Sequence, residues 1–326
     1  MITNPRDTRQ GARADALADF AADLRYYLTQ DPRQLPSRYL YDALGSALFE
    51  AICHLPWYPL TSAELRLLNA HGREILDDNF AIVAELGAGS GEKLSALIRS
   101  AGGRDQLDFH LIDISHEALV HATRALEQVV PRARVTTHEA RYEVGLYDFA
   151  AARPAAGRAL ALLLGSNIGN FDPPAREALL VTIRRALRSG DGLLLGADLV
   201  KREDVLLLAY DDPLNVTAAF NRNLLVRINR ELGGDFDLAA FAHRAVWNKA
   251  QSRVEMHLES TRQQTITIPA ADLQFAMRAG ETIWTESSYK FMPDEIAGML
   301  ERCGFRTEAQ WVDAEGCFAL TRAVAA

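Results

Sequence analysis

The pattern of apolar and polar positions switches between two periods along the middle of the chain. Short apolar runs, typical of buried strands, alternate with segments whose apolar residues recur at helical spacing. We expect strands near 81–86, 107–113, 133–137, 159–164 and 192–197, and helices near 92–101, 116–129 and 174–188. This alternation predicts an α/β fold with a doubly wound, mostly parallel sheet. Ligands of such sheets bind beyond the carboxyl ends of the strands.

The alternation stops after Asp198. The following segment, 199–286, contains one long helical pattern and strand-like runs, and a helix and two strands near 292–322 then resume the α/β pattern. Helical spacing over 13–49, broken at two prolines, precedes the sheet. We predict a core formed by 61–198 and 287–326, a second, smaller α+β domain formed by 13–60 and 199–286, and disorder over residues 1–12, which are rich in Arg, Asp and Gly.

A glycine-rich segment joins the first strand to the first helix. It reads Glu85-Leu86-Gly87-Ala88-Gly89-Ser90-Gly91. A strand, a glycine turn and a helix start in this order bring backbone close to a nucleotide. A dinucleotide fingerprint would need glycine at position 92, where Glu92 stands. The segment instead resembles the first motif of S-adenosylmethionine-dependent methyltransferases. A dinucleotide enzyme and a merely tight turn are the alternatives.

Composition narrows the class of protein. The 326 residues are 48% hydrophobic, and the net charge of −8 comes without a long basic run, so we expect no nucleic-acid partner. Apolar runs such as 159–164 are too short to span a bilayer, and residues 1–13 lack the apolar region of a signal peptide. Cys53, Cys303 and Cys317 show no metal-binding spacing. We expect a soluble, cytoplasmic protein without a metal or membrane partner.

Polar residues that follow the predicted strands are candidates for ligand binding. Asp113 ends the second strand, where a carboxylate can accept hydrogen bonds from ribose hydroxyls, although it could merely cap the next helix. Lys93 lies in the first turn after the glycines and could equally be a solvated lysine. The segment Leu164–Phe171 follows the fourth strand; its Asn170 can both donate and accept, which suits an amino acid's carboxylate and amine, but a plain turn is the alternative.

Three further positions carry weaker signals. The segment Tyr210–Pro213 is expected to open the long helix of 216–232. Met256 lies in the middle of a strand-like run and could simply fill the core. Glu286, near the point where the chain rejoins the core, could be an ordinary surface charge.

Several blocks together give a more specific resemblance. Beside the glycine segment, the chain contains Tyr41–Phe49, Leu55–Tyr58, Gly165–Asn170, Ala209–Asp212, Val216–Asn223, Asn229–Leu232 and Thr285–Phe291. In this order they resemble the L-histidine Nα-methyltransferases of ergothioneine biosynthesis, from about residue 35 to the C-terminus. The resemblance implies a Rossmann-like class I methyltransferase core with a second domain. It also implies transfer of three methyl groups from S-adenosylmethionine to histidine, giving hercynine.

The resemblance also implies roles for individual residues. It assigns the methyl donor to Gly87, Gly89, Lys93, Asp113 and, at the adenine, Arg141 and Tyr142. It assigns the amino-acid head group to Tyr58, Gly165, Asn170 and Tyr210, with Tyr41 close by, and the imidazole to Met256, Glu286 and Ser288. A carboxylate and a hydroxyl can satisfy both nitrogens of an imidazole ring, whereas a benzene ring would leave these two groups buried without partners. The expected partners are L-histidine and its mono- and dimethylated forms, and a monomer is expected.

One position departs from the family pattern. Family members carry Asp-Phe after the third strand, whereas this chain has Arg141-Tyr142. Tyr142 can still stack on adenine, but Arg141 has only donors and cannot accept from the adenine amino group. We expect that contact to pass to backbone or to another acid such as Glu139. Attack by a neutral amine on an activated methyl needs alignment and desolvation rather than a covalent nucleophile. A methyltransferase for another amino acid and a silent binding protein are the rival interpretations.

Overall fold

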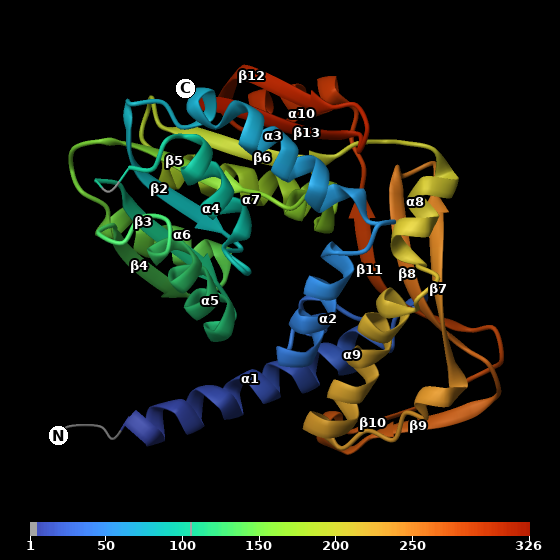
Figure 1. Ribbon diagram of the computed structural model, residues 1–326. Coiled ribbons are helices and arrows are strands. Elements are labelled where there is room, and N and C mark those ends of the chain that lie inside the picture. Colours follow the sequence, from blue (N-terminus) through green and yellow to red (C-terminus); the bar gives the residue numbers. More distant parts are fainter. Residues whose placement is uncertain (1–4, 105) are drawn as a thin grey trace. The chain divides into compact units, whose positions relative to one another are not determined.

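The computed structural model describes residues 5–104 and 106–326. The chain divides into two compact units (Figure 1). Unit 1 contains the residues up to Tyr58 together with Glu203–Lys249 and Arg253–Ser287. Unit 2 contains Pro59–Arg202, Ala250–Ser252 and Ser288–Ala326. The assignment of donor binding to one part of the chain and acceptor binding to the other stays a prediction.

Unit 2 is built on one large sheet. Within the described residues its strand order is β12-β13-β6-β5-β2-β3-β4. The strands are β2 (Phe80–Leu86), β3 (Asp108–Asp113), β4 (Arg134–Glu139), β5 (Arg158–Leu163), β6 (Gly192–Asp198), β12 (Phe305–Asp313) and β13 (Phe318–Ala325). Strands β2 to β6 are parallel, and β13 is antiparallel to both β6 and β12. The central strands are buried on both faces, which is why they are almost continuously apolar in sequence.

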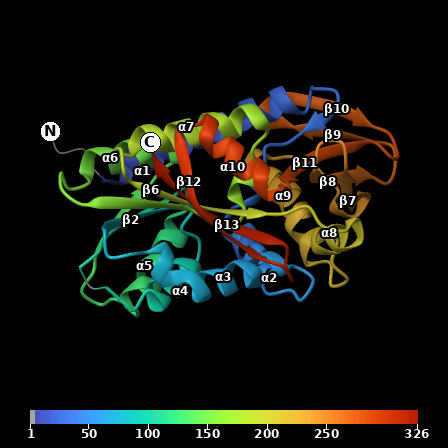
Figure 2. The same ribbon diagram turned by 90° about the horizontal axis from the view of Figure 1, so that it is seen from above.

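Helices cover both faces of this sheet, as Figure 2 shows. One face carries α3 (Pro59–Ile75), α4 (Glu92–Ser100) and α5 (His116–Glu127), and the other carries α6 (Tyr142–Ala152), α7 (Pro173–Ala186) and α10 (Pro293–Arg302). Buried side chains such as Leu86, Ile112 and Leu300 form the core under the second face. The predicted α/β class with a doubly wound, mostly parallel sheet is therefore confirmed.

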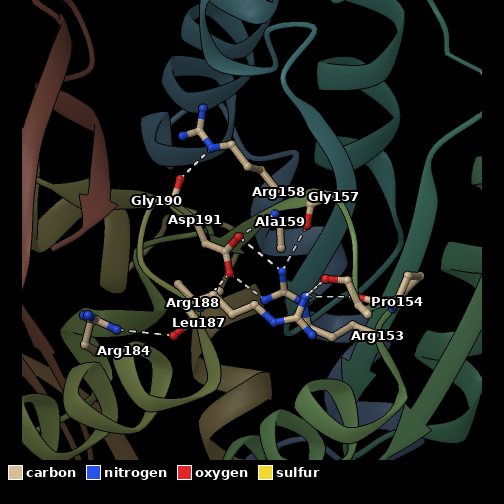
Figure 3. Close-up of polar contacts among 11 residues, drawn as sticks. Arg153, Pro154, Gly157, Arg158, Ala159, Arg184, Leu187, Arg188, Gly190 and Asp191 are labelled. Carbon is tan, nitrogen blue, oxygen red and sulfur yellow. Dashed lines mark hydrogen bonds and ion pairs between the residues drawn. The ribbon is translucent and has the colours of Figure 1, made fainter.

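A buried ion pair joins the amino-terminal ends of β5 and β6 (Figure 3). Arg153 donates to both carboxylate oxygens of Asp191, at 2.5 and 3.2 Å. The backbone nitrogens of Ala159 and Arg188 also donate to this carboxylate, at 2.8 and 2.7 Å. Burial alone would raise the pKa of Asp191, but these hydrogen bonds hold the pKa below its ordinary value. This cluster fixes the amino-terminal ends of β5 and β6, whereas the glycine turn lies at the carboxyl end of β2.

Unit 1 combines helices with an open sheet. The sheet has the order β1-β11-β8-β7 in the part of the chain that is described, and a hairpin pairs β9 with β10. The strands are β1 (Arg33–Gln34), β7 (Phe241–Asn248), β8 (Arg253–Ser260), β9 (Gln264–Ile268), β10 (Leu273–Met277) and β11 (Thr282–Tyr289). The helices are α1 (Pro5–Tyr27), α2 (Ala43–Cys53), α8 (Glu203–Tyr210) and α9 (Val216–Leu232).

The structure corrects four details of the prediction. Helix α1 already begins at Pro5, where disorder was expected; proline is tolerated in a first helical turn, and residues 1–4 lie outside the described residues. Helices α6 and α8 have no counterpart in the prediction. Tyr210 ends α8 instead of opening the long helix, which begins at Val216.

No helix of the described residues is long and apolar enough to cross a membrane.

Candidate functional site

The glycine turn of unit 2 has a backbone that side chains would obstruct. Gly87 and Gly89 have φ angles of 77° and 51°, in the left-handed region that favours glycine. Gly87 N donates to Ile112 O at 2.8 Å, so the turn is fixed to the end of β3. Gly89 N donates to the Asp113 carboxylate at 3.2 Å. The structure thus brings the predicted donor residues of β2 and β3 together at the carboxyl ends of adjacent strands.

Asp113 is held so that its carboxylate keeps accepting capacity. One oxygen accepts from Gly89 N and the other from Ser115 N at 2.9 Å. The helix α5 is capped by the Ser115 side chain, which accepts from Ala118 N at 3.2 Å, so capping is not the role of Asp113. Burial raises the pKa of Asp113, and the backbone hydrogen bonds oppose this. A carboxylate has about four acceptor positions, so Asp113 keeps accepting capacity beyond these backbone contacts.

Tyr142 and Arg141 lie at the start of α6. A Cβ atom placed on Gly87 would be 2.8 Å from the Tyr142 hydroxyl oxygen, so the phenol lies directly against the glycine turn. Burial raises the pKa of Tyr142, so the phenol stays neutral. Arg141 is exposed and makes no hydrogen bond from its side chain to any described residue. Glu139, the suggested substitute acceptor, lies 3.0 Å from His116 Nδ1.

A buried carboxylate that sequence reasoning missed lies beside Lys93. Thr61 and Glu64 have the spacing of a capping box, but α3 begins earlier, at Pro59, and the Glu64 side chain is 0% exposed. Glu64 lies 2.7 Å from Lys93 Nζ and accepts from Gly165 N with both oxygens at 2.9 Å. A Cβ atom on Gly196 would lie 2.1 Å from Glu64 Oε1, so this carboxylate fits only because β6 has glycine there.

Glu85 adds a second buried acid near Lys93. Glu85 is 2% exposed and is the last residue but one of β2. Burial raises the pKa of Glu85 to about 8, with Lys93 acting in the opposite direction and the Glu64 and Asp113 carboxylates adding to the rise. At neutral pH Glu85 is therefore mostly protonated. A cation bound near it would favour its ionised form.

The segment after β5 has an unusual backbone. Gly165 and Ser166 both have positive φ angles, 74° and 56°. The strained Ser166 is fixed because its hydroxyl oxygen accepts from Asp198 N at 3.0 Å. Asn170 lies in the short 3-10 helix Asn167–Asn170; it is half-buried, and its amide forms no hydrogen bond with the described residues. A Cβ atom on Gly165 would lie 2.8 Å from Lys93 Nζ, so the predicted acceptor and donor residues meet here.

In unit 1 the three predicted tyrosines join one aromatic cluster. The Tyr58 ring lies 6.2 Å from that of Tyr210, and the Tyr41 ring lies 5.5 Å from that of Phe220. Phe49 connects them, at 6.5 Å from Tyr58 and 5.6 Å from Tyr41. The cluster brings together residues that are far apart in sequence and gives the tyrosines defined orientations.

The polar residues of the specific sequence blocks hold this cluster in place. His243 Nε2 lies 2.7 Å from Tyr210 O, and Asn221 Nδ2 lies 2.9 Å from His243 Nδ1. Burial lowers the pKa of His243, so the ring is neutral, with its hydrogen on Nε2. Asp212 accepts from three backbone nitrogens at the start of α9, of which Thr217 N is nearest at 2.7 Å. These contacts fix the backbone at Tyr210 and at the start of α9.

The residues predicted to contact the imidazole are Met256, Glu286 and Ser288. Met256 is 2% exposed on β8, and its carbonyl accepts from the Thr285 hydroxyl of the neighbouring strand β11 at 3.0 Å. Glu286 and Ser288 lie on β11 and are 9% and 5% exposed. Lys290 donates to the Ser288 hydroxyl oxygen at 2.9 Å. Glu286 is therefore not the exposed surface charge that was weighed as an alternative.

Comparison with known proteins decides the family. Residues 20–325 match the model of the family described as histidine-specific, SAM-dependent methyltransferase. The chain belongs to this family. The histidine N-alpha-methyltransferase of Mycolicibacterium smegmatis is 39% identical over 314 residues, covering 95% of this chain and 97% of that protein. That of Mycobacterium tuberculosis is 38% identical, covering 91% and 92%. Ergothioneine biosynthesis protein 1 of Schizosaccharomyces pombe is 25% identical, covering 85% of this chain and 37% of the fungal protein.

The residues of unit 2 fit the co-substrate of this SAM-dependent methyltransferase family. The glycine turn leaves backbone accessible, Asp113 keeps acceptor positions, and Glu85 is a buried acid that a cationic group would ionise. Sequence reasoning missed the buried Glu64, Asp198 and Lys290 of this family member. Only Asp198 gave a sequence signal, because it directly follows an apolar strand and ligands of such sheets bind beyond the carboxyl ends of the strands.

Proposed function

We propose that the protein transfers three methyl groups from S-adenosylmethionine to the α-amino group of L-histidine, giving hercynine for ergothioneine biosynthesis. The observation that carries this proposal is the pair Glu286 and Ser288. They are buried two positions apart on β11, and side chains two apart on a strand point to the same side. A carboxylate and a hydroxyl so placed match the two nitrogens of an imidazole ring.

The donor is assigned to the turn of Gly87 and Gly89, with Asp113 accepting from the ribose and Tyr142 facing the adenine. S-adenosylmethionine supplies a methyl group already activated by its sulfonium. Lys93 is oriented by Glu64 at 2.7 Å and favours a carboxylate such as that of the donor's methionine part. Arg141 contributes little, because it is exposed and forms no hydrogen bond with described residues.

The acceptor's head group is assigned to Tyr58, Gly165, Asn170 and Tyr210, with Tyr41 shaping the aromatic cluster. The half-buried Asn170 amide, without a hydrogen-bond partner among the described residues, can bind a carboxylate or an amine. Met256 is assigned to the face of the imidazole. Mono- and dimethylhistidine are then bound in turn, and the backbone surface at Gly165 leaves room for the added methyl groups.

The reaction needs alignment more than acid–base chemistry. The nitrogen–carbon bond forms as the carbon–sulfur bond breaks, so the amine must be neutral at each attack, and one proton leaves for each methyl transferred. The residues' contribution is to hold the amine in line and to exclude water. We further propose that the protein acts as a cytoplasmic monomer.

Mass spectrometry of histidine incubated with the protein and S-adenosylmethionine tests the proposal. We expect mass gains of one, two and finally three methyl groups, with fragmentation placing all three on the α-nitrogen. Methylation of a ring nitrogen, or preference for another amino acid, would contradict the substrate assignment. Absence of turnover with any amino acid would favour the rival of a silent binding protein.

A further inference from the structure

A buried carboxylate of α3 is matched by a glycine in the interior of a strand. The Glu64 side chain is 0% exposed, and on β6 a Cβ atom placed on Gly196 would lie 2.1 Å from Glu64 Oε1. Any larger residue at position 196 would therefore displace the carboxylate. Burying a charge and placing glycine inside a strand both cost stability, which points to a role of Glu64 beyond the packing of the core.

The carboxylate accepts from backbone that lies far from its own helix in sequence. Both of its oxygens accept from Gly165 N at 2.9 Å. Gly165 and the next residue, Ser166, have φ angles of 74° and 56°, so the chain enters the segment 165–170 in a left-handed conformation that serine rarely adopts. The hydrogen bond to Glu64 holds the first peptide of this unusual segment in place.

The rest of the segment is held by separate contacts. Ser166 Oγ accepts from Asp198 N at 3.0 Å. A Cβ atom on Gly169 would lie 2.7 Å from Tyr289 O, so the segment also lies tightly against the backbone there. These contacts fix the middle of the segment against its neighbours in unit 2, whereas Glu64 fixes its first residue.

The segment extends from the acceptor residues to the glycine turn. Asn167 Nδ2 lies 3.8 Å from the position of a Cβ atom on Gly165 and 3.0 Å from that of a Cβ atom on Gly87. Glu64, Gly87 and the segment 165–170 all belong to unit 2. A shift of Gly165 would carry Asn167, two residues further on, with it. The position of one backbone nitrogen therefore affects the place where the predicted donor and acceptor residues meet.

We propose that Glu64 is a positioning residue for the methyl acceptor: it holds the segment 165–170 so that the amine of histidine is aligned with the donor's methyl group. This inference rests on the proposed function, in which Gly165 and Asn170 bind the acceptor's head group. In-line transfer is sensitive to alignment, and a displacement of about 1 Å can lower the rate roughly 100-fold. Holding Gly165 N requires an acceptor oxygen at this place but no negative charge, so this role differs from the ion pair with Lys93.

Gly196→Ala tests the proposal without changing any polar group. The added methyl group must displace the Glu64 carboxylate from Gly165 N. With the methyl donor saturating, we expect kcat/KM for histidine to fall by about 10- to 100-fold. Gly298→Ala on α10 is the matched control, because a Cβ atom there would lie 3.6 Å from the Arg302 side chain, an ordinary contact. Its kcat/KM should stay within about twofold of that of the unmodified protein.

A double-mutant cycle shows whether Gly196→Ala acts through Glu64. In the Glu64→Ala background the effect of Gly196→Ala should nearly vanish, because no carboxylate is left to displace. A general distortion of β6 would instead lower kcat/KM by the same factor in both backgrounds. Glu64→Gln keeps an oxygen for Gly165 N, so at saturating donor its KM for histidine should stay within about threefold, whereas Glu64→Ala should raise this KM at least about tenfold.

Each outcome has a distinct meaning, and circular dichroism checks that the variants fold. If Gly196→Ala keeps the kinetics of the unmodified protein, or lowers kcat/KM by the same factor with and without Glu64, the inference is wrong. If Gly196→Ala does not fold, the two variants of Glu64 decide, and equal KM values for histidine in Glu64→Gln and Glu64→Ala would overturn the inference. If the unmodified protein does not methylate histidine, the proposed function itself is wrong, and the inference is wrong with it.

Discussion

Both carboxylate oxygens of Glu64 lie 2.9 Å from the backbone nitrogen of Gly165. The same carboxylate is 2.7 Å from Lys93 Nζ. Glu64 belongs to α3, Lys93 to α4 and Gly165 to the segment after β5, so one buried charge connects three separate elements. Gly165 has a positive φ angle and no side chain, so its backbone conformation is fixed by the hydrogen bond that its N–H donates to Glu64.

Glu64→Gln should weaken binding of the methyl donor by about tenfold, since a hydrogen bond to a charged group contributes about 1.5–3 kcal/mol. The amide still accepts from Gly165 N, but Lys93 loses the negative charge of Glu64 at 2.7 Å. Isothermal titration calorimetry with S-adenosylhomocysteine measures the change. Glu74→Gln is the matched control, because Glu74 lies on the same helix and is exposed. Equal affinities for the two variants would show that Glu64 does not orient the donor site.

Asp113→Ala should weaken donor binding about 100-fold, because two charge-assisted hydrogen bonds to the ribose are lost. Arg141→Ala should change the affinity by less than about threefold, since an exposed side chain without partners contributes little. The same calorimetry ranks the two variants. The reverse order would move the adenosine site away from the glycine turn.

The alternating part of the chain could be predicted because its strands are buried on both faces. Such strands read as apolar runs, and β2, β3, β5 and β6 begin and end within two residues of the predicted positions. Helix α6 was missed because its apolar residues lack a clear helical period and Gly145 interrupts them. Strands β7 and β11 mix apolar with polar and charged residues, so the sequence pattern that predicts a strand is weak there.

The buried charges of the site could not be read from the sequence. Glu64 follows Thr61 with the spacing of a capping box, and only the position of the α3 start, at Pro59, shows that the pattern is accidental. Lys290 and Asp198 are 92 positions apart, and their contact depends on how β11 passes the end of β6. Local patterns report which residues are apolar, whereas these contacts depend on which loops meet in space.

Asp191→Asn should lower the free energy of unfolding by about 3–5 kcal/mol at pH 7, the usual cost of breaking a buried pair. The folded pKa of Asp191 is lowered, so its contribution is complete above the unfolded pKa near 4 and is lost as pH falls through the folded pKa. The difference between variant and unmodified protein should therefore shrink below about pH 4. Urea unfolding measures it, and Asp78→Asn, at a fully exposed site, should change stability by less than about 0.5 kcal/mol.

Glu85 should give stability the opposite pH dependence. Its folded pKa is about 8, well above the unfolded value near 4.3, so between these values the folded state holds the extra proton and stability falls as pH rises. Glu85→Gln should remove this fall, making the variant progressively more stable relative to the unmodified protein from pH 5 to pH 8. Urea unfolding without donor tests this, with Glu92→Gln on the exposed face of α4 as control. A constant difference across this range would show that Glu85 is ionised in the folded protein.

Glu286→Ala should lower kcat/KM for histidine by roughly 10- to 150-fold. A carboxylate that accepts from the imidazole N–H contributes about 1.5–3 kcal/mol, and about 1.4 kcal/mol corresponds to a factor of ten. Because Glu286 is assigned to the acceptor, donor affinity should stay within about twofold. Ser287→Ala is the matched control: Ser287 is the next residue on β11, is half-buried, and by strand alternation points to the other side. Discrimination against phenylalanine should also weaken, since the buried carboxylate no longer excludes an apolar ring. If Glu286→Ala keeps normal histidine turnover, Glu286 does not contact the ring, and the imidazole must be bound by other residues.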